Sequence, residues 1–319
     1  MNRTTARLAL RLHRFEIVVL GALGILATAL SLLVCAWLDG TGYGANCLRA
    51  MQTGADMSHA CVVAQDQFYK TLGSPIVALT QILLFFVPYL LAVLTGVAIV
   101  GREVERGTAR LVWSLAPSRA AWFGGRLLPV VAAVAAVALL CGLAADRLSM
   151  SVVPGTTPWA SLLDYGNRGV DLAARVLFAF AVSVLIGAAL GRVLPALLVA
   201  TIVIFVGLGG GASVHGRILA TEALPIASEN NYYDPANLTY DSGFVAPDGS
   251  YLSYDAMVHL YPQPTDPDAA WNPPYPQAQL TVLGARYPFV VGREVVVLLA
   301  GVLGTLLLSF VLVRRARPG

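Results

Sequence analysis

The chain has 319 residues, of which 57% are hydrophobic and only 12% are charged, and its mean hydropathy is +0.71. A soluble domain carries about 25% charged residues, so this composition excludes an ordinary soluble enzyme or binding module. The formal net charge of +3 comes from arginines that flank apolar runs. It therefore indicates membrane topology and gives no support to a nucleic-acid partner.

Six apolar runs of about 20 residues or more divide the chain. About 20 apolar residues in a helix cross a bilayer core of about 30 Å, and these runs do not alternate as barrel strands would. The sequence therefore predicts an all-α integral membrane protein with a single domain over residues 1–319. The six predicted transmembrane helices are 17–38, 75–100, 121–145, 172–191, 193–212 and 290–313.

The distribution of arginine predicts the orientation of these spans. Arginines lie in the N-terminal arm, in the 101–120 loop, at Arg192 and in the C-terminal tail, whereas the segment 213–289 has two arginines and eight acidic residues. The positive-inside rule therefore predicts that both termini and the 101–120 loop are cytoplasmic. The segment 213–289 is expected outside, in a multi-pass protein of the plasma membrane.

The N-terminal arm, residues 1–16, has an amphipathic pattern. Its arginines at positions 3, 7, 11 and 14 share one helical face, and an apolar face lies beside it. A basic helix of this kind lies in the membrane interface and binds lipid. The alternative is that the arginines only fix the orientation of the first span.

The external segments carry two further patterns. Cys47 and Cys61 lie in the first external loop, 39–74, and are expected to form a disulfide, with two free thiols as the alternative. In 213–289, aspartates recur every seven residues, at 234, 241, 248 and 255. We expect short strands with evenly spaced turns there, including a short β hairpin over "GFVAPDGSYLS", in an external cap between spans five and six.

Residues for catalysis, cofactor binding or metal binding are not predicted. The only lysine is Lys70, so the chain lacks a P-loop and cannot bind ATP in that way. Asp171 and Glu294 fall at span ends, so no span is expected to contain a pair of acids. Arg126 and Arg293 are expected to extend to lipid headgroups. Arg175 could do the same or could line a passage.

The charged run "GREVERGTARLVWSLAPSR", 101–119, stands between the second and third spans. Its pattern predicts a helix end, a turn at Gly107 and Thr108, and a short amphipathic helix that contains Trp113 and is stopped by Pro117. A solvated loop does not need a tryptophan, so the sequence predicts a short helix along the cytoplasmic face.

This run resembles the cytoplasmic loop of ABC-2-type exporter permeases, and the actinobacterial members most closely. The similarity rests on Glu103, Glu105, Gly107, Thr108 and the serines and arginine that follow, and it extends to 169–205 and 285–316. It implies that 101–120 is the coupling loop, whose helix docks on an ATPase subunit. The implied coupling residues are Arg102, Glu103, Glu105, Arg106, Gly107, Thr108 and Trp113. The alternative for the two glutamates is local pairing with Arg102, Arg106 or Arg110.

The resemblance implies an ATP-driven exporter that moves a lipophilic, drug-like, peptide or lipid substrate out of the cell. Its implied partners are two copies of an ABC ATPase and a second permease subunit, expected to be a second copy of this chain. A membrane-anchored sensor or scaffold with a ligand-binding external domain is the alternative. An intramembrane enzyme is disfavoured because the spans lack a catalytic set.

Overall fold

A computed structural model describes residues 14–53, 55–108, 118–227, 236–263 and 271–315. Five of its helices are long and apolar enough to cross a membrane. They are α2 (Arg14–Gly40), α5 (Pro75–Glu105), α7 (Arg119–Val152), α8 (Gly169–Leu190) and α11 (Tyr287–Arg315). A further helix, α9 (Val193–Ala220), is apolar over its first part, Val193–Gly207.

Several helices extend beyond the apolar runs that predict them. Residues 101–105, expected as the polar end of a helix before the turn at Gly107, complete α5, and residues 146–152, which follow the predicted span 121–145, complete α7. Likewise, α9 continues to Ala220, into the segment expected to form the cap. Hydropathy falls where the side chains become polar, whereas the backbone hydrogen bonds of a helix continue past that point.

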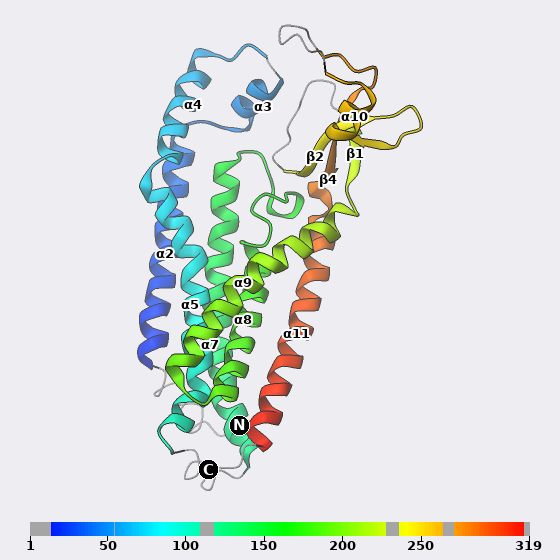
Figure 1. The fold of residues 1–319 in the computed structure, drawn as a ribbon. Helices are drawn as coiled ribbons and strands as arrows, with labels where there is room; N and C mark the ends of the chain where they lie inside the picture. The colour runs from blue at the N-terminus through cyan, green and yellow to red at the C-terminus, as the bar shows by residue number, and fades with distance from the viewer. Residues whose placement is uncertain (1–13, 54, 109–117, 228–235, 264–270, 316–319) are drawn as a thin grey trace.

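Helix α8 lies at the centre of the bundle and packs against α5, α7, α9 and α11 (Figure 1). It approaches α5 closely at positions where glycines replace bulkier side chains. A Cβ added to Gly187 would lie 2.6 Å from the Val97 carbonyl oxygen, and one added to Gly96 would lie 2.8 Å from the Ser183 Cβ. Small residues let helix backbones approach in this way, and they fix how α5 and α8 pack.

The bundle has two different ends, as Figure 1 shows. At one end, here called the loop end, lie the start of α2, the end of α5, the α8–α9 turn and the end of α11. At the other, here called the cap end, lie α3 (Ala45–Thr53), α4 (His59–Leu72) and a β-sheet. Four basic residues belong to the helix ends that meet at the loop end: Arg106 after α5, Arg119 at the start of α7, Arg192 before α9 and Arg314 in the last turn of α11.

The sheet at the cap end has four antiparallel strands in the order β1-β4-β2-β3. The strands are β1 (Leu224–Ala227), β2 (Leu238–Val245), β3 (Tyr251–Ser253) and β4 (Gln277–Val282). Strands β2 and β3 form a hairpin over the Asp-Gly turn, where Gly249 has a φ of 82°. The expectation of strands throughout is wrong at Tyr254–Leu260, which forms helix α10 because the Ser253 hydroxyl caps its first turn.

Candidate functional site

The charged run that suggested a coupling role begins at the loop end, where α5 stops. The Arg106 N–H bonds the Arg102 carbonyl at 3.1 Å, and Gly107 then takes a left-handed φ of 67° that ends the helix. Arg106 and Gly107 are exposed, and Arg102 is half-buried. Arg110 and Trp113 lie outside the described residues, so the expected short helix stays a prediction.

Glu103 faces inward and forms an ion pair with Arg126 of α7. The Arg126 Nη1 and Glu103 Oε1 atoms are 2.6 Å apart, and the two side chains are only 10% and 14% exposed. The Thr108 hydroxyl donates a second hydrogen bond, of 2.5 Å, to the other carboxylate oxygen. The Arg126 guanidinium also lies 5.0 Å from the centre of the Trp122 ring. Glu103 therefore links the end of α5 to the start of α7.

This ion pair bears on two expectations from the sequence. The expectation that Arg126 extends to lipid headgroups is wrong, since its guanidinium is buried against Glu103. Glu103 thus has a partner outside the 101–120 loop, 23 positions further along the chain, while local pairing with Arg110, which lies outside the described residues, stays a prediction. A single charge inside an otherwise apolar run was the signal that Arg126 needs an internal partner.

Glu105 connects α5 to α9. Its Oε2 atom accepts a hydrogen bond of 3.1 Å from the backbone N–H of Val193, the first residue of α9. The first N–H groups of a helix lack partners within the helix, and a carboxylate there is also favoured by the helix dipole. The α8–α9 turn, where Gly191 has a φ of 61°, lies against Val104. Glu105 thus holds this turn to the end of α5.

Arg119, at the other end of the charged run, contacts α11. Its Nη1 atom donates to the carbonyl oxygens of Arg314 at 2.7 Å and Val313 at 3.4 Å. These are among the last carbonyls of α11, which have no partner within that helix. Ser118 caps the start of α7 by accepting from the Ala121 N–H at 3.0 Å. Together, the contacts of Glu103, Glu105 and Arg119 form what we call the loop-end junction, which ties the charged run to α7, α9 and α11.

A second group of buried charges lies near the cap end and was not predicted. Arg168 is almost fully buried, pairs with Asp146 of α7 at 2.8 Å and donates to the carbonyl oxygens of Leu163 at 2.7 Å and Ser161. Its guanidinium lies 4.5 Å from the centre of the Tyr287 ring of α11. Arg168 therefore fastens the 153–168 segment to α7 and α11.

Beside this pair, Arg175 lies between two carboxylates. Its Nη2 atom is 2.6 Å from Glu294 Oε1 of α11, and its Nε atom is 3.5 Å from Asp171 Oδ2. The Tyr165 hydroxyl donates to the other oxygen of Glu294. Burial and this carboxylate raise the pKa of Tyr165, so the hydroxyl stays protonated.

The arrangement around Arg175 adds to one expectation from the sequence. Asp171 lies in the first turn of α8 and Glu294 two turns into α11, and the fold brings them together, so the bundle contains a pair of acids from two different helices. Arg175 lies within ion-pair distance of both acids. Arg293 of α11, which was expected to extend to headgroups, pairs with Glu222. The available signal was topological, because the predicted spans put these residues at the same end of the bundle.

The structure joins Cys47 of α3 and Cys61 of α4 in a disulfide, with Cα atoms 5.4 Å apart. Behind it, the Tyr43 and Phe68 rings pack with their centres 4.8 Å apart. These contacts hold α3 and α4 together as a helical hairpin above α2 and α5.

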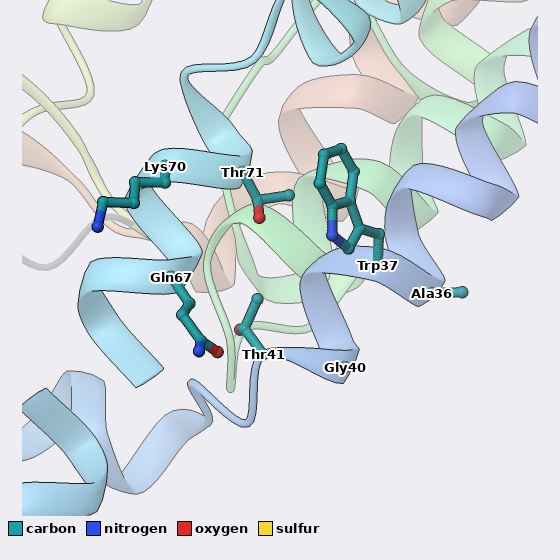
Figure 2. A pocket seen from close by; sticks show the side chains of 7 residues that line it. All are labelled: Ala36, Trp37, Gly40, Thr41, Gln67, Lys70 and Thr71. Atoms are coloured by element: carbon teal, nitrogen blue, oxygen red, sulfur yellow. The ribbon is translucent and has the colours of Figure 1, made fainter. Parts of the chain in front are cut away.

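An open hollow of about 410 Å³ lies between the end of α2 and α4. Figure 2 shows Trp37 and Thr71 near each other from these two helices, while Lys70 extends away from Trp37. Lys70 is exposed and pairs with Asp66 on its own helix at 2.6 Å. The hollow therefore offers no buried charge among its described lining residues, and no group of three potential metal ligands occurs in the described part of the chain.

Comparison with known proteins gives one match. The family described as ABC-2 membrane transporter related matches residues 15–215, which run from α2 through most of α9. The match includes the loop-end junction apart from the end of α11, and it includes Asp171 and Arg175. No curated protein and no solved structure matches the sequence.

Proposed function

Because this chain belongs to the ABC-2 membrane transporter related family, we propose that it is the membrane-spanning subunit of an ATP-driven exporter. Family membership makes it a multi-pass permease component of an ABC transporter, a class that normally works with an ABC ATPase. The observation that carries the proposal is the loop-end junction. A charged run anchored to three different helices is suited to pass a movement from a docked partner into the bundle.

In the proposed mechanism, the 101–120 loop docks on the ATPase from the cytoplasmic side. Arg102, Glu105, Arg106, Gly107, Thr108 and Trp113 supply the docking surface, and Glu103 positions it from within. When two ATPase subunits close on ATP, the loop pulls α9 through Glu105 and α11 through Arg119. Glu103 and Arg126 keep the end of α5 moving together with the start of α7.

The proposed assembly contains two ATPase subunits and a second copy of this chain. Within the most apolar 18-residue stretch of each helix, 67% of the residues are buried in α5, but only 28% in α2 and 11% in α11. The outer helices α2 and α11 therefore present broad apolar faces to lipid or to the second copy. The flanking arginines support a plasma-membrane orientation with both termini in the cytoplasm. The exported substrate is proposed to be lipophilic or amphipathic, since the bundle is largely apolar.

The docking role is tested by charge reversal at an exposed residue. The full-length chain is co-expressed with its candidate P-loop ATPase, and Arg106→Glu is compared with the wild type. Because Arg106 is exposed at the end of α5, the change should leave the fold intact and lower ATPase co-purification about tenfold, the equivalent of about 1.4 kcal/mol. Lys70→Glu, an exposed charge reversal at the cap end, is the matched control and should retain the ATPase.

A second variant separates docking from transmission. Glu105→Gln keeps the polar surface but weakens the contact with the Val193 N–H, so we expect a larger loss of transport than of ATPase binding. If the Arg106→Glu and Trp113→Ala variants each co-purify with as much ATPase as the Lys70→Glu control does, the 101–120 loop is not the docking site. A sensor or scaffold without an ATPase partner would then be the better description.

A further inference from the structure

The cluster around Arg175 is unusual because it carries an unbalanced charge inside the protein. It contains Asp171 and Arg175 of α8, Glu294 of α11 and the hydroxyl of Tyr165. Its neighbours Asp146 and Arg168 form a separate pair whose charges balance. With both of its acids ionised, the cluster around Arg175 has one negative charge in excess.

That excess charge is concentrated on Asp171. The side chain of Asp171 is 1% exposed. Neither of its carboxylate oxygens accepts a hydrogen bond from the described residues, and the Nε atom of Arg175, 3.5 Å away, is likewise without a hydrogen-bond partner among them. Arg175 instead directs its Nη2 atom to Glu294, which also receives the Tyr165 hydroxyl. Glu294 is thus the carboxylate of the pair that is stabilised by hydrogen bonds, and Asp171 is not.

The other groups around Asp171 do not compensate its charge. Tyr89 of α5 has a buried hydroxyl without a hydrogen-bond partner among the described residues, and it lies within electrostatic range of Asp171, Arg175 and Glu294. Tyr165 and Tyr287 also lie within electrostatic range of Asp171. Asp171 is in the first turn of α8, where the helix dipole favours a negative charge. This attraction is smaller than the penalty for burying an ionised carboxylate that has no hydrogen bonds.

We infer that Asp171 binds a proton in this conformation, so that the contact between α8 and α11 contains a proton-binding site. Protonated Asp171 removes the excess charge and leaves Arg175 and Glu294 as a balanced ion pair. The inference concerns this chain alone and does not depend on an ATPase. It also predicts a conformational consequence, because water reaching Asp171 would release the proton and place two negative charges beside one arginine. A separation of α8 from α11 near the cap end is therefore favoured as the pH rises.

The direct test is infrared spectroscopy of the purified full-length chain in detergent at neutral pH. A protonated carboxylic acid has a carbonyl stretching band that a carboxylate lacks. We expect such a band in the wild type, its loss in Asp171→Asn and its persistence in Asp66→Asn, which changes an exposed aspartate of α4. If Asp171→Asn removes no carboxylic-acid band from the wild-type spectrum, Asp171 is ionised and the inference is overturned.

Thermal unfolding gives an independent test. If the folded chain holds a proton that the unfolded chain releases, stability falls as the pH rises, since the folded state then binds more protons. At neutral pH, Asp171→Asn should unfold at the wild-type temperature or above it. At mildly alkaline pH, its stability should not show the fall with rising pH that is expected of the wild type. Glu294→Gln should unfold at a lower temperature, because it breaks the ion pair with Arg175. If Asp171→Asn lowers the unfolding temperature as Glu294→Gln does, Asp171 acts as an ionised partner and no proton is bound.

Discussion

At the scale of single residues, the main finding is that charges in this membrane protein have internal partners. Arg126, Arg168 and Arg175 are each more than four-fifths buried as side chains and each pairs with an acid on another helix. The sequence shows that these charges exist and that they lie near span ends. It cannot show the pairing, because the partners are separated by 22 to 119 positions, and one of them, Glu103, lies in a run that also suggests a surface role.

The pair of Glu103 and Arg126 makes a stability prediction at this scale. Glu103→Gln leaves Arg126 buried without its counter-ion, and Arg126→Met does the same to Glu103. Each should destabilise the chain by about 3–5 kcal/mol, because breaking one side of a buried pair exposes the full desolvation cost of the other. Thermal unfolding in detergent measures both.

The double variant Glu103→Gln with Arg126→Met is the control, and it should recover much of the loss because no unpaired charge is left. Single variants as stable as the wild type would mean that Glu103 points out of the protein, toward solvent or a partner. In that case its proposed role inside the loop-end junction would have to be abandoned.

At the scale of helices, the positions of the spans could be predicted and their ends could not. Apolar runs locate the membrane core, so each described span overlaps its predicted range. The predicted span 75–100 stops five residues before α5 does, because "GREVE" is polar yet helical, and the helix ends where Gly107 adopts a left-handed φ. The close approach of α8 to α5 at Gly187 joins segments that are distant in the sequence.

The contact between α8 and α5 gives a prediction at this scale. In Gly187→Ala, the added Cβ would lie 2.6 Å from the backbone of Val97, where no flexible side chain can move aside. Overpacking of this kind costs about 1–3 kcal/mol, so the variant should unfold at a lower temperature than the wild type. Gly304→Ala on α11 is the matched control, since its Cβ would meet no atom within 4 Å. Equal effects of the two changes would argue against close α5–α8 packing.

At the scale of the whole molecule, the family and the membrane class follow from the sequence, whereas the cap does not. A hairpin with an Asp-Gly turn is a local signal and could be predicted. The pairing of β1 with β4 joins Leu224 to Thr281, and β4 then pairs with β2, so most of the sheet depends on contacts between distant segments. The helical hairpin of α3 and α4 was likewise expected only as a loop containing two cysteines.

The disulfide of that hairpin makes a prediction for the assembled molecule. Replacing Cys47 and Cys61 by Ser opens a loop with a sequence separation of 14 residues, and in the chain-entropy model this costs about 3 kcal/mol. We expect local loosening of α3 and α4, measured as faster proteolysis at 39–74, with the helical bundle retained. Cys35→Ser and Cys141→Ser, which change the two buried free cysteines, are controls for general damage. Labelling of Cys47 by a thiol reagent without prior reduction would show that the bond is absent.

Helix α11 packs along α8 with one face and is attached near both of its ends. Arg119 bonds its last carbonyl groups, and Arg175 holds Glu294 near its start. With 29 residues and a rise of 1.5 Å per residue, it is about 43 Å long, enough to reach from one membrane surface to the other. A stiff rod fixed in this way transmits displacement along its axis with little loss. Under the proposed mechanism, a pull on the carbonyl groups at one end of α11 is expected to move Glu294 near its other end, without any relay of side chains between them.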